Sequence, residues 1–169
     1  MNAFLTSRWS YAALLLVCGG LLGFGLFLEH VRGLEPCPLC VFQRLAFMAT
    51  GVVALVALLH GPGRVGGLVY ACLVFITSIT GATIAGRQVW LQHLPADQVP
   101  ACGPGLDYML EVFPLQEVLQ MVFSGSGECA EVQWRFLELS IPEWSLACFA
   151  GFIILAVMQW LAFRKTTAT

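Results

Sequence analysis

Long uncharged apolar runs restrict the possible folds of this chain more than any other feature of its sequence. Three runs of about twenty residues contain no charged side chain: 9–28, 65–86 and 144–163. At 1.5 Å per residue, twenty helical residues cross the roughly 30 Å hydrocarbon layer of a bilayer. A fourth run, 45–59, becomes long enough if its helix begins near Pro38, which places Arg44 in the first two turns. Because uninterrupted apolar runs of this length are helical in a membrane, the sequence predicts four transmembrane helices.

The composition agrees with an integral membrane protein. Hydrophobic residues make up 59% of the 169 residues and charged residues only 11%, against roughly 25% charged residues in a soluble domain; the mean hydropathy is +0.82. A net charge of −2 with a single lysine excludes a nucleic-acid binder, which needs a basic surface. We therefore expect an all-α membrane protein, a four-transmembrane-helix bundle with a long periplasmic loop that contains a short interfacial helix.

The charged residues set the expected boundaries and orientation of this single integral membrane domain, 1–169. We expect spans at about 9–28, 41–60, 65–86 and 144–163, and periplasmic loops at about 29–40 and 87–143. If both termini are cytoplasmic, the inner side carries four basic residues and no acidic one: Arg8, Arg64, Arg164 and Lys165. Positive residues in short segments mark the cytoplasmic side, so we expect a multi-pass protein of the bacterial inner membrane with both termini inside. A cleaved signal peptide fits less well, because its apolar region is usually only 7–15 residues long.

The long outer loop contains one helical pattern. Apolar residues recur at three- and four-residue spacing after Pro114: Leu115, Val118, Leu119, Val122 and Phe123. This spacing is typical of an amphipathic helix. Such a helix either lies in the membrane interface or packs onto the end of the bundle, and the sequence leaves both arrangements open.

Seven cysteines fall into two environments. Cys18, Cys72 and Cys148 lie within apolar spans, where cysteine usually acts as a small inert hydrophobic residue. The other four belong to the outer side, which is oxidising in a bacterial envelope: Cys37, Cys40, Cys102 and Cys129. The outer cysteines are therefore the candidates for redox chemistry.

The strongest local motif is Cys37-Pro38-Leu39-Cys40 at the start of the second predicted span. At a helix start these two cysteines are one turn apart, close enough for a disulfide. The free N–H groups and positive dipole end of the helix would stabilise a thiolate at Cys40, and Arg44, four residues on, would add a cation. A thiolate so stabilised is a good leaving group in thiol–disulfide exchange. The same spacing also serves zinc, but the helix start and the arginine favour redox chemistry.

The second pair of outer cysteines lies in the long loop. Four outer cysteines permit three pairings, and proximity in the sequence favours Cys37 with Cys40 and Cys102 with Cys129. Glycines and a proline beside Cys102 and Cys129 suit a bond that is attacked and rearranged. Two other interpretations remain: permanent disulfides that stiffen the loop, or a tetrathiolate zinc site.

A site that generates disulfides needs an electron acceptor. The sequence has no GxGxxG motif after a strand and no CxxCH haem motif. A lipid-soluble quinone suits a dithiol at the outer end of a membrane helix, because fixed donors there can stabilise the charge that its oxygens gain. Arg44 could supply one donor and His93 or Arg87 others, although each could instead be an interface anchor or an ordinary loop residue.

These residues resemble those of a known family, the bacterial disulfide bond formation (DsbB) proteins. The likeness lies in the four spans, in Cys37-Pro38-Leu39-Cys40 followed by Arg44, and in a long loop that holds Cys102 and Cys129. The loop segments Gly127-Glu128-Cys129-Ala130-Glu131, Gln133-Trp134 and Phe136-Leu137, and Pro142-x-Trp144 before the last span, also look like that family. The resemblance covers nearly the whole chain.

The resemblance implies an inner-membrane, quinone-dependent oxidoreductase that re-oxidises a periplasmic DsbA-like thioredoxin-fold dithiol oxidase. It implies that the partner's thiolate attacks Cys102, that Cys129 then attacks Cys37, and that Cys40 leaves as a thiolate. Ubiquinone, or menaquinone, would bind non-covalently or as a transient adduct at Cys40. Arg44 matches the family's quinone-site arginine, and His93 is expected at the position of its quinone-proximal histidine.

Two other functions are compatible with the sequence. A reductase of the vitamin K epoxide reductase type also combines four helices, a CxxC motif and a quinone, although it usually carries that motif late in the bundle. A membrane scaffold without enzymatic activity would use the same cysteines as permanent disulfides or as zinc ligands.

Overall fold

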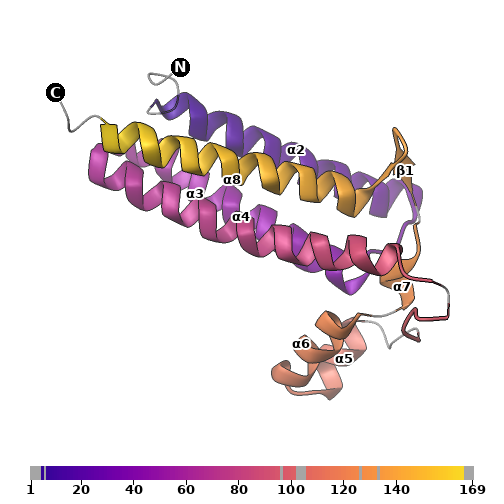
Figure 1. Ribbon diagram of the computed structural model, residues 1–169. Coiled ribbons are helices and arrows are strands. Elements are labelled where there is room, and N and C mark those ends of the chain that lie inside the picture. Colours follow the sequence, from indigo (N-terminus) through magenta and orange to yellow (C-terminus); the bar gives the residue numbers. More distant parts are fainter. Residues whose placement is uncertain are drawn as a thin grey trace.

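The computed structural model describes residue 5 and residues 7–95, 97–101, 106–125, 127–132 and 134–165. Four long helices form a bundle (Figure 1): α2 (Arg8–Arg32), α3 (Pro38–His60), α4 (Arg64–Gln92) and α8 (Ile141–Lys165). All four are long and apolar enough to cross a membrane. The predicted fold class, an all-α four-helix membrane bundle, is therefore confirmed.

The helices extend beyond the apolar runs, most clearly at the C-terminal ends of α2 and α4. The segment 29–32 was expected in a loop, as a solvated turn, but it forms the last turn of α2, which ends at Gly33 in the left-handed conformation (φ 67°). Likewise α4 continues to Gln92, six residues past its apolar run. Charged side chains end an apolar run without ending a helix, whereas a residue that readily adopts positive φ does end it.

Glycines allow α4 and α8 to approach closely. A Cβ atom on Gly81 would lie 2.3 Å from the ring of Phe149, and one on Gly67 would lie 2.4 Å from the ring of Phe163. Aromatic rings of α8 therefore fill the space that the two glycines of α4 leave open, the arrangement by which small residues bring membrane helices together. In chain order, α2 packs on α3, α3 on α4 and α4 on α8.

The middle of the bundle is an apolar core with few polar contacts. Phe47 of α3 stacks on Phe149 of α8 with ring centroids 4.1 Å apart. Towards the end where α2 begins and α8 ends, the buried Gln159 side chain donates a hydrogen bond to the Ser10 hydroxyl at 2.9 Å. This bond joins α2 and α8 at that end, which we call the inner end.

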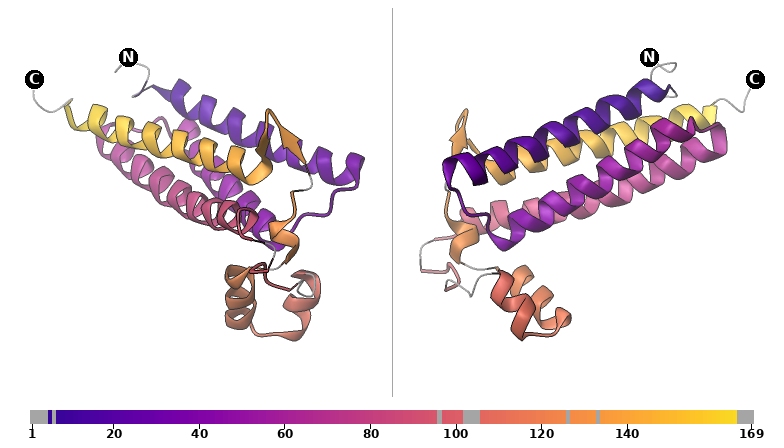
Figure 2. Two further views of the ribbon diagram at one scale, coloured as in Figure 1. Left: turned by 45° about the vertical axis from the view of Figure 1, so that its right-hand side comes forward. Right: turned by 180° about the vertical axis from the view of Figure 1, so that it is seen from behind.

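The loop elements gather at the opposite, outer end of the bundle (Figure 2): α5 (Leu106–Val112), α6 (Leu115–Ser124), α7 (Gly127–Ala130), and the two-stranded hairpin β1 (Arg135–Phe136) and β2 (Leu139–Ser140). The short helix predicted after Pro114 is α6. Its Val118 and Val122 are buried in an apolar cluster with Leu91 of α4, while Leu115 and Phe123 remain exposed. One face of α6 thus packs on the bundle, and other apolar side chains of the helix, such as Leu115 and Phe123, are exposed.

Candidate functional site

Cys37 and Cys40 lie side by side at the start of α3. Their sulfur atoms are 2.7 Å apart, a small movement from the roughly 2.05 Å of a disulfide bond. Cys37 is the N-cap of the helix and Pro38 occupies the first turn, where proline costs no hydrogen bond. The sulfur of Cys37 accepts a hydrogen bond from the backbone N–H of Cys40 at 3.4 Å. The start of the helix therefore donates to Cys37, which occupies the cap position.

Cys129 joins this pair from α7. Its side chain is buried and makes a hydrogen-bonding contact with Cys37. The hydrogen bonds with Cys129 and Cys40, together with burial, raise the pKa of the Cys37 thiol. Three of the four outer cysteines are thus gathered in one cluster, in which Cys37 and Cys129 are buried and Cys40 is half-buried.

The fourth outer cysteine, Cys102, lies outside the described residues. The residue before it, Ala101, accepts a hydrogen bond at 3.3 Å from the backbone N–H of Gly127, the first residue of α7. The chain therefore passes close to the helix that carries Cys129 immediately before it reaches Cys102.

Two glutamines that the sequence analysis did not single out complete the surroundings of the sulfur pair. The Gln88 side-chain nitrogen of α4 donates to both Cys37 and Cys40, with an N···S distance of 3.2 Å in each case. Gln43 of α3 donates in turn to the Gln88 side-chain oxygen at 2.6 Å. Their signal in the sequence is weak: Gln43 lies three residues after Cys40, on the same helix face, but nothing local pairs it with Gln88.

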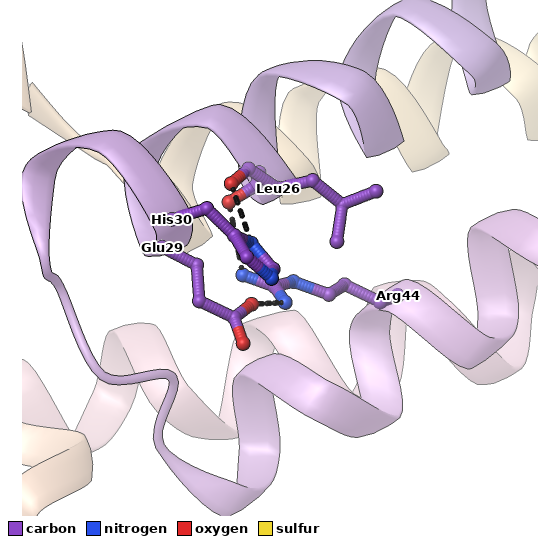
Figure 3. A network of polar contacts seen from close by, with 5 residues as sticks. Leu26, Glu29, His30 and Arg44 are labelled. Carbon is purple, nitrogen blue, oxygen red and sulfur yellow. Dashed lines mark hydrogen bonds and ion pairs between the residues drawn. The ribbon is translucent and has the colours of Figure 1, made fainter.

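Arg44 reaches across to α2 (Figure 3). Its guanidinium forms an ion pair with Glu29 and donates to the backbone carbonyl of Gly25 at 3.1 Å. His30, beside it, contacts the Leu26 carbonyl at 3.1 Å. Glu29, which was expected in the 29–40 loop, therefore orients the arginine from the last turn of α2. Among the described residues, the Cys40 sulfur makes side-chain hydrogen-bonding contacts with Cys37 and Gln88, and not with Arg44.

A cavity of about 450 Å³ opens beside Cys40 and Arg44, within the usual 300–1,000 Å³ of ligand pockets. It lies between α2, α3 and the start of α8, and residues of the hairpin close its outer side. The apolar and aromatic walls come from Leu21, Leu22, Phe24, Leu28, Phe47, Trp134, Phe136, Ile141 and Trp144. The Trp144 indole nitrogen donates to the Phe136 carbonyl at 3.0 Å, which ties the hairpin to α8. Cys40 of the CxxC motif thus borders a largely apolar cavity.

The other two predicted donors lie elsewhere. His93 follows the last residue of α4 with its ring nitrogen 2.8 Å from the Val89 carbonyl, and it is not among the described residues that line the cavity. Arg87 donates to the Phe123 and Ser124 carbonyls at 3.1 and 2.8 Å, so it caps the C-terminal end of α6. The role predicted for His93 stays a prediction.

The three cysteines of the apolar spans occupy different positions. Cys18 is buried in the bundle core, and Cys72 is exposed on the outside of α4, facing the membrane region. Cys148 of α8 lines the cavity. They lie apart from the cluster of Cys37, Cys40 and Cys129.

Comparison with known proteins gives a consistent result over nearly the whole chain. Residues 7–159 match the family model described as "Disulfide bond formation protein DsbB". The protein named "Disulfide bond formation protein B" from Hahella chejuensis is 55% identical over 161 residues, which cover 95% of this chain and 98% of the relative. The protein of the same name from Marinobacter nauticus is 55% identical over 157 residues, 93% of this chain and 94% of the relative. The one from Chromobacterium violaceum is 47% identical over 165 residues, 98% of each.

Proposed function

The chain belongs to the DsbB family of disulfide bond formation proteins, and on that premise we propose that it transfers two electrons from a periplasmic DsbA-like thioredoxin-fold protein to a membrane quinone. Membership supports the coarser statement directly: this is a multi-pass protein of the bacterial inner membrane that takes part in disulfide-bond formation. The partner and the quinone are the finer part of the proposal.

The observation that carries the proposal is the position of the CxxC pair between a third cysteine and an apolar cavity. On one side, Cys129 contacts Cys37, which suits transfer of a disulfide between the loop and the helix. On the other side, Cys40 lines the cavity. A scaffold has no need of a cavity next to its disulfide, whereas a quinone-coupled oxidase needs both neighbours.

The cavity residues fit a quinone. An apolar, aromatic-walled space suits the ring and the start of an isoprenoid tail. Arg44 supplies fixed N–H donors, which its contacts with Glu29 and Gly25 hold in the cavity wall, for an oxygen that gains negative charge on reduction. A quinone bound there would accept two electrons and two protons. The chain's own part is to exclude water, to hold that oxygen and to present the Cys40 sulfur.

Each thiol–disulfide exchange in the proposed sequence conserves the number of sulfur–sulfur bonds, and only the final step is an oxidation. The partner's thiolate attacks Cys102, forming a mixed disulfide and releasing Cys129 as a thiolate. Cys129 attacks Cys37, which breaks the Cys37–Cys40 bond, and the electron pair of that bond leaves on Cys40. The partner's second cysteine then attacks the mixed disulfide, departs oxidised and releases Cys102 as a thiolate. Cys102 then attacks Cys129, which re-forms the Cys102–Cys129 bond and releases Cys37 as a thiolate. Cys37 and Cys40 would regain their disulfide as their two electrons pass to a quinone bound in the cavity.

The proposal is tested with purified protein in bilayer discs, a reduced DsbA-like protein and ubiquinone. We expect one partner disulfide to form for each ubiquinone reduced. The Cys40→Ser variant should lose this activity by at least a hundredfold, because no sulfur remains to pass the electrons on. The measurement follows partner thiols and ubiquinone absorbance together.

Cys72→Ser is the matched control, since this cysteine is exposed on the outside of α4 and should leave the rate unchanged. Full turnover by Cys40→Ser with ubiquinone would exclude the proposed electron route. Reduction of vitamin K epoxide at a rate above that of ubiquinone would instead favour the reductase type of function.

A further inference from the structure

We propose that the Gln88 amide is a catalytic hydrogen-bond donor that holds the negative charge of the Cys40 sulfur, and that Gln43 is the positioning residue that orients it. This inference rests on the proposed function, because it assigns both residues a part in the same reaction. It concerns two side chains whose residue type alone suggests no chemistry.

The first step is the chemistry of the contact. The Gln88 side-chain nitrogen lies 3.2 Å from the sulfur of Cys37 and 3.2 Å from that of Cys40. An amide NH₂ group can only donate hydrogen bonds. A donor aimed at a sulfur atom favours the form of that sulfur that carries negative charge, as donors of an oxyanion hole favour a charged oxygen.

The second step is the orientation of the amide. Gln43 donates to the Gln88 side-chain oxygen at 2.6 Å. If the Gln88 amide were reversed, its NH₂ group would face the NH₂ group of Gln43, and two donors would meet without an acceptor. The Gln43 contact therefore keeps the Gln88 donor turned towards the sulfur atoms.

The third step separates this role from ordinary packing. Both glutamines are 3% exposed, and a buried amide needs a partner whatever its function. One hydrogen bond between Gln43 and Gln88 would already join α3 to α4. The Gln88 nitrogen is directed at two reacting sulfur atoms in addition, in a buried site where electrostatic interactions are stronger than in water.

The expected effect lies in the exchange step. As Cys129 bonds to Cys37, the Cys37–Cys40 bond breaks and its electron pair moves onto Cys40. No net oxidation occurs in this step, and the new charge appears on the sulfur that Gln88 faces. Stabilising that charge makes Cys40 the better leaving group, and keeps it as a thiolate beside the cavity.

The test measures the Cys40 thiol alone, without quinone or partner. Full-length protein with Cys37, Cys102 and Cys129 changed to Ser is alkylated with iodoacetamide across a pH series, and modification of Cys40 is counted by peptide mass spectrometry. Changing Gln88→Met in this background should raise the midpoint of the alkylation profile by about one pH unit. The isosteric Gln88→Glu, which replaces the donor by an acceptor, should raise it further.

The positioning role of Gln43 has its own readout. Gln43→Met should raise the midpoint by less than Gln88→Met does, and the double variant should shift it no more than Gln88→Met alone, because Gln43 acts only through Gln88. Gln159→Met is the matched control: it removes a buried glutamine at the inner end of the bundle and should leave the midpoint unchanged.

Two results would overturn the inference: an unchanged midpoint in both Gln88 variants, or additive shifts in the double variant. A fall in thermal stability without a change in midpoint would show that the amide pair only packs α3 against α4. Because the assay contains no quinone, a chain that fails to reduce ubiquinone yet shows the shift would contradict the proposed function and leave this inference standing. Full turnover with an unchanged midpoint would support the proposed function and contradict this inference.

Discussion

At the scale of single residues, the site depends on polar side chains that are held by other polar side chains. Gln88 faces the sulfur atoms because Gln43 occupies its oxygen, and Arg44 faces the cavity wall because Glu29 and the Gly25 carbonyl hold its guanidinium. In each case a second polar group fixes the orientation of the donor: Gln43 fixes the Gln88 amide, and Glu29 fixes the Arg44 guanidinium. Such preorganised donors stabilise developing charge without a cost of reorganisation.

The arginine gives a prediction at this scale. Arg44→Leu should raise the KM for ubiquinone by roughly ten- to a hundredfold, because a hydrogen bond to a charged group is worth roughly 1.5–3 kcal/mol. Glu29→Gln keeps an oxygen acceptor for Arg44 and should have a smaller effect in the same direction. The measurement is ubiquinone reduction at varied quinone concentration, with thermal unfolding alongside it.

Both variants should leave the Tm nearly unchanged, since the two side chains are 24% and 31% exposed and ion pairs of this kind contribute at most about 1 kcal/mol. A large fall in Tm with an unaltered KM would mean that the ion pair serves the bundle and not the cavity.

The residue scale also shows where sequence reasoning stops. The positions of Cys37 and Cys40 at a helix start follow from Pro38 and the apolar run behind it, so that motif is readable in the chain. The hydrogen-bond partners of Cys40 cannot be predicted in this way, because Gln88 lies on another helix, 48 residues away in the sequence. No local pattern determines which helices pack against each other. For the same reason Arg44 was expected beside Cys40, whereas its partner is on α2.

At the scale of elements, the close packing of α4 on α8 depends on glycines, which have no side chain. The rings of Phe149 and Phe163 occupy the places where Cβ atoms on Gly81 and Gly67 would lie. The helices themselves could be predicted from their apolar runs, but their ends could not: α2 stops at Gly33 rather than at its first charge. The contact of α4 with α8 is equally hidden in the sequence, because glycine in a membrane helix need not mark a contact.

Gly81 supplies the prediction for this scale. Gly81→Ala should destabilise the protein by about 1–3 kcal/mol, as overpacking of a tight core does, since the added methyl group meets the Phe149 ring at 2.3 Å. Gly86→Ala, on the same helix with nothing within 4 Å, is the matched control and should be neutral or slightly stabilising. Stability is measured by thermal unfolding in detergent.

Adding Phe149→Leu to Gly81→Ala should restore part of the loss, because the smaller side chain leaves room for the methyl group. Equal effects of Gly81→Ala and Gly86→Ala would contradict the packing described here.

At the scale of the whole molecule, the bundle has two unlike ends. The inner end carries the start of α2, the turn between α3 and α4, and the end of α8, and the loop elements lie at the outer end (Figure 1). The cysteine cluster and the cavity also belong to the outer end. Because the number of long helices is even, the start of α2 and the end of α8 lie at the same end. Which end faces the periplasm is the part that charge alone predicts.

The orientation is tested by labelling from one side of the membrane. A cysteine introduced at Gly63, in the turn after α3, should react with an impermeant maleimide only after spheroplasts are opened. One introduced at Ser124, at the exposed end of α6, should react in intact spheroplasts. The reverse pattern would place the cysteine cluster in the cytoplasm and contradict the proposed partner.

The bond between Ser10 and Gln159 has a further consequence. It draws α2 and α8 together at the inner end, while farther out the two helices stand on opposite sides of the cavity. The proposed quinone would therefore reach Cys40 from the side of the bundle where the cavity lies. The proposed partner would instead attack Cys102, which belongs to the outer loop, so the two would approach different cysteines.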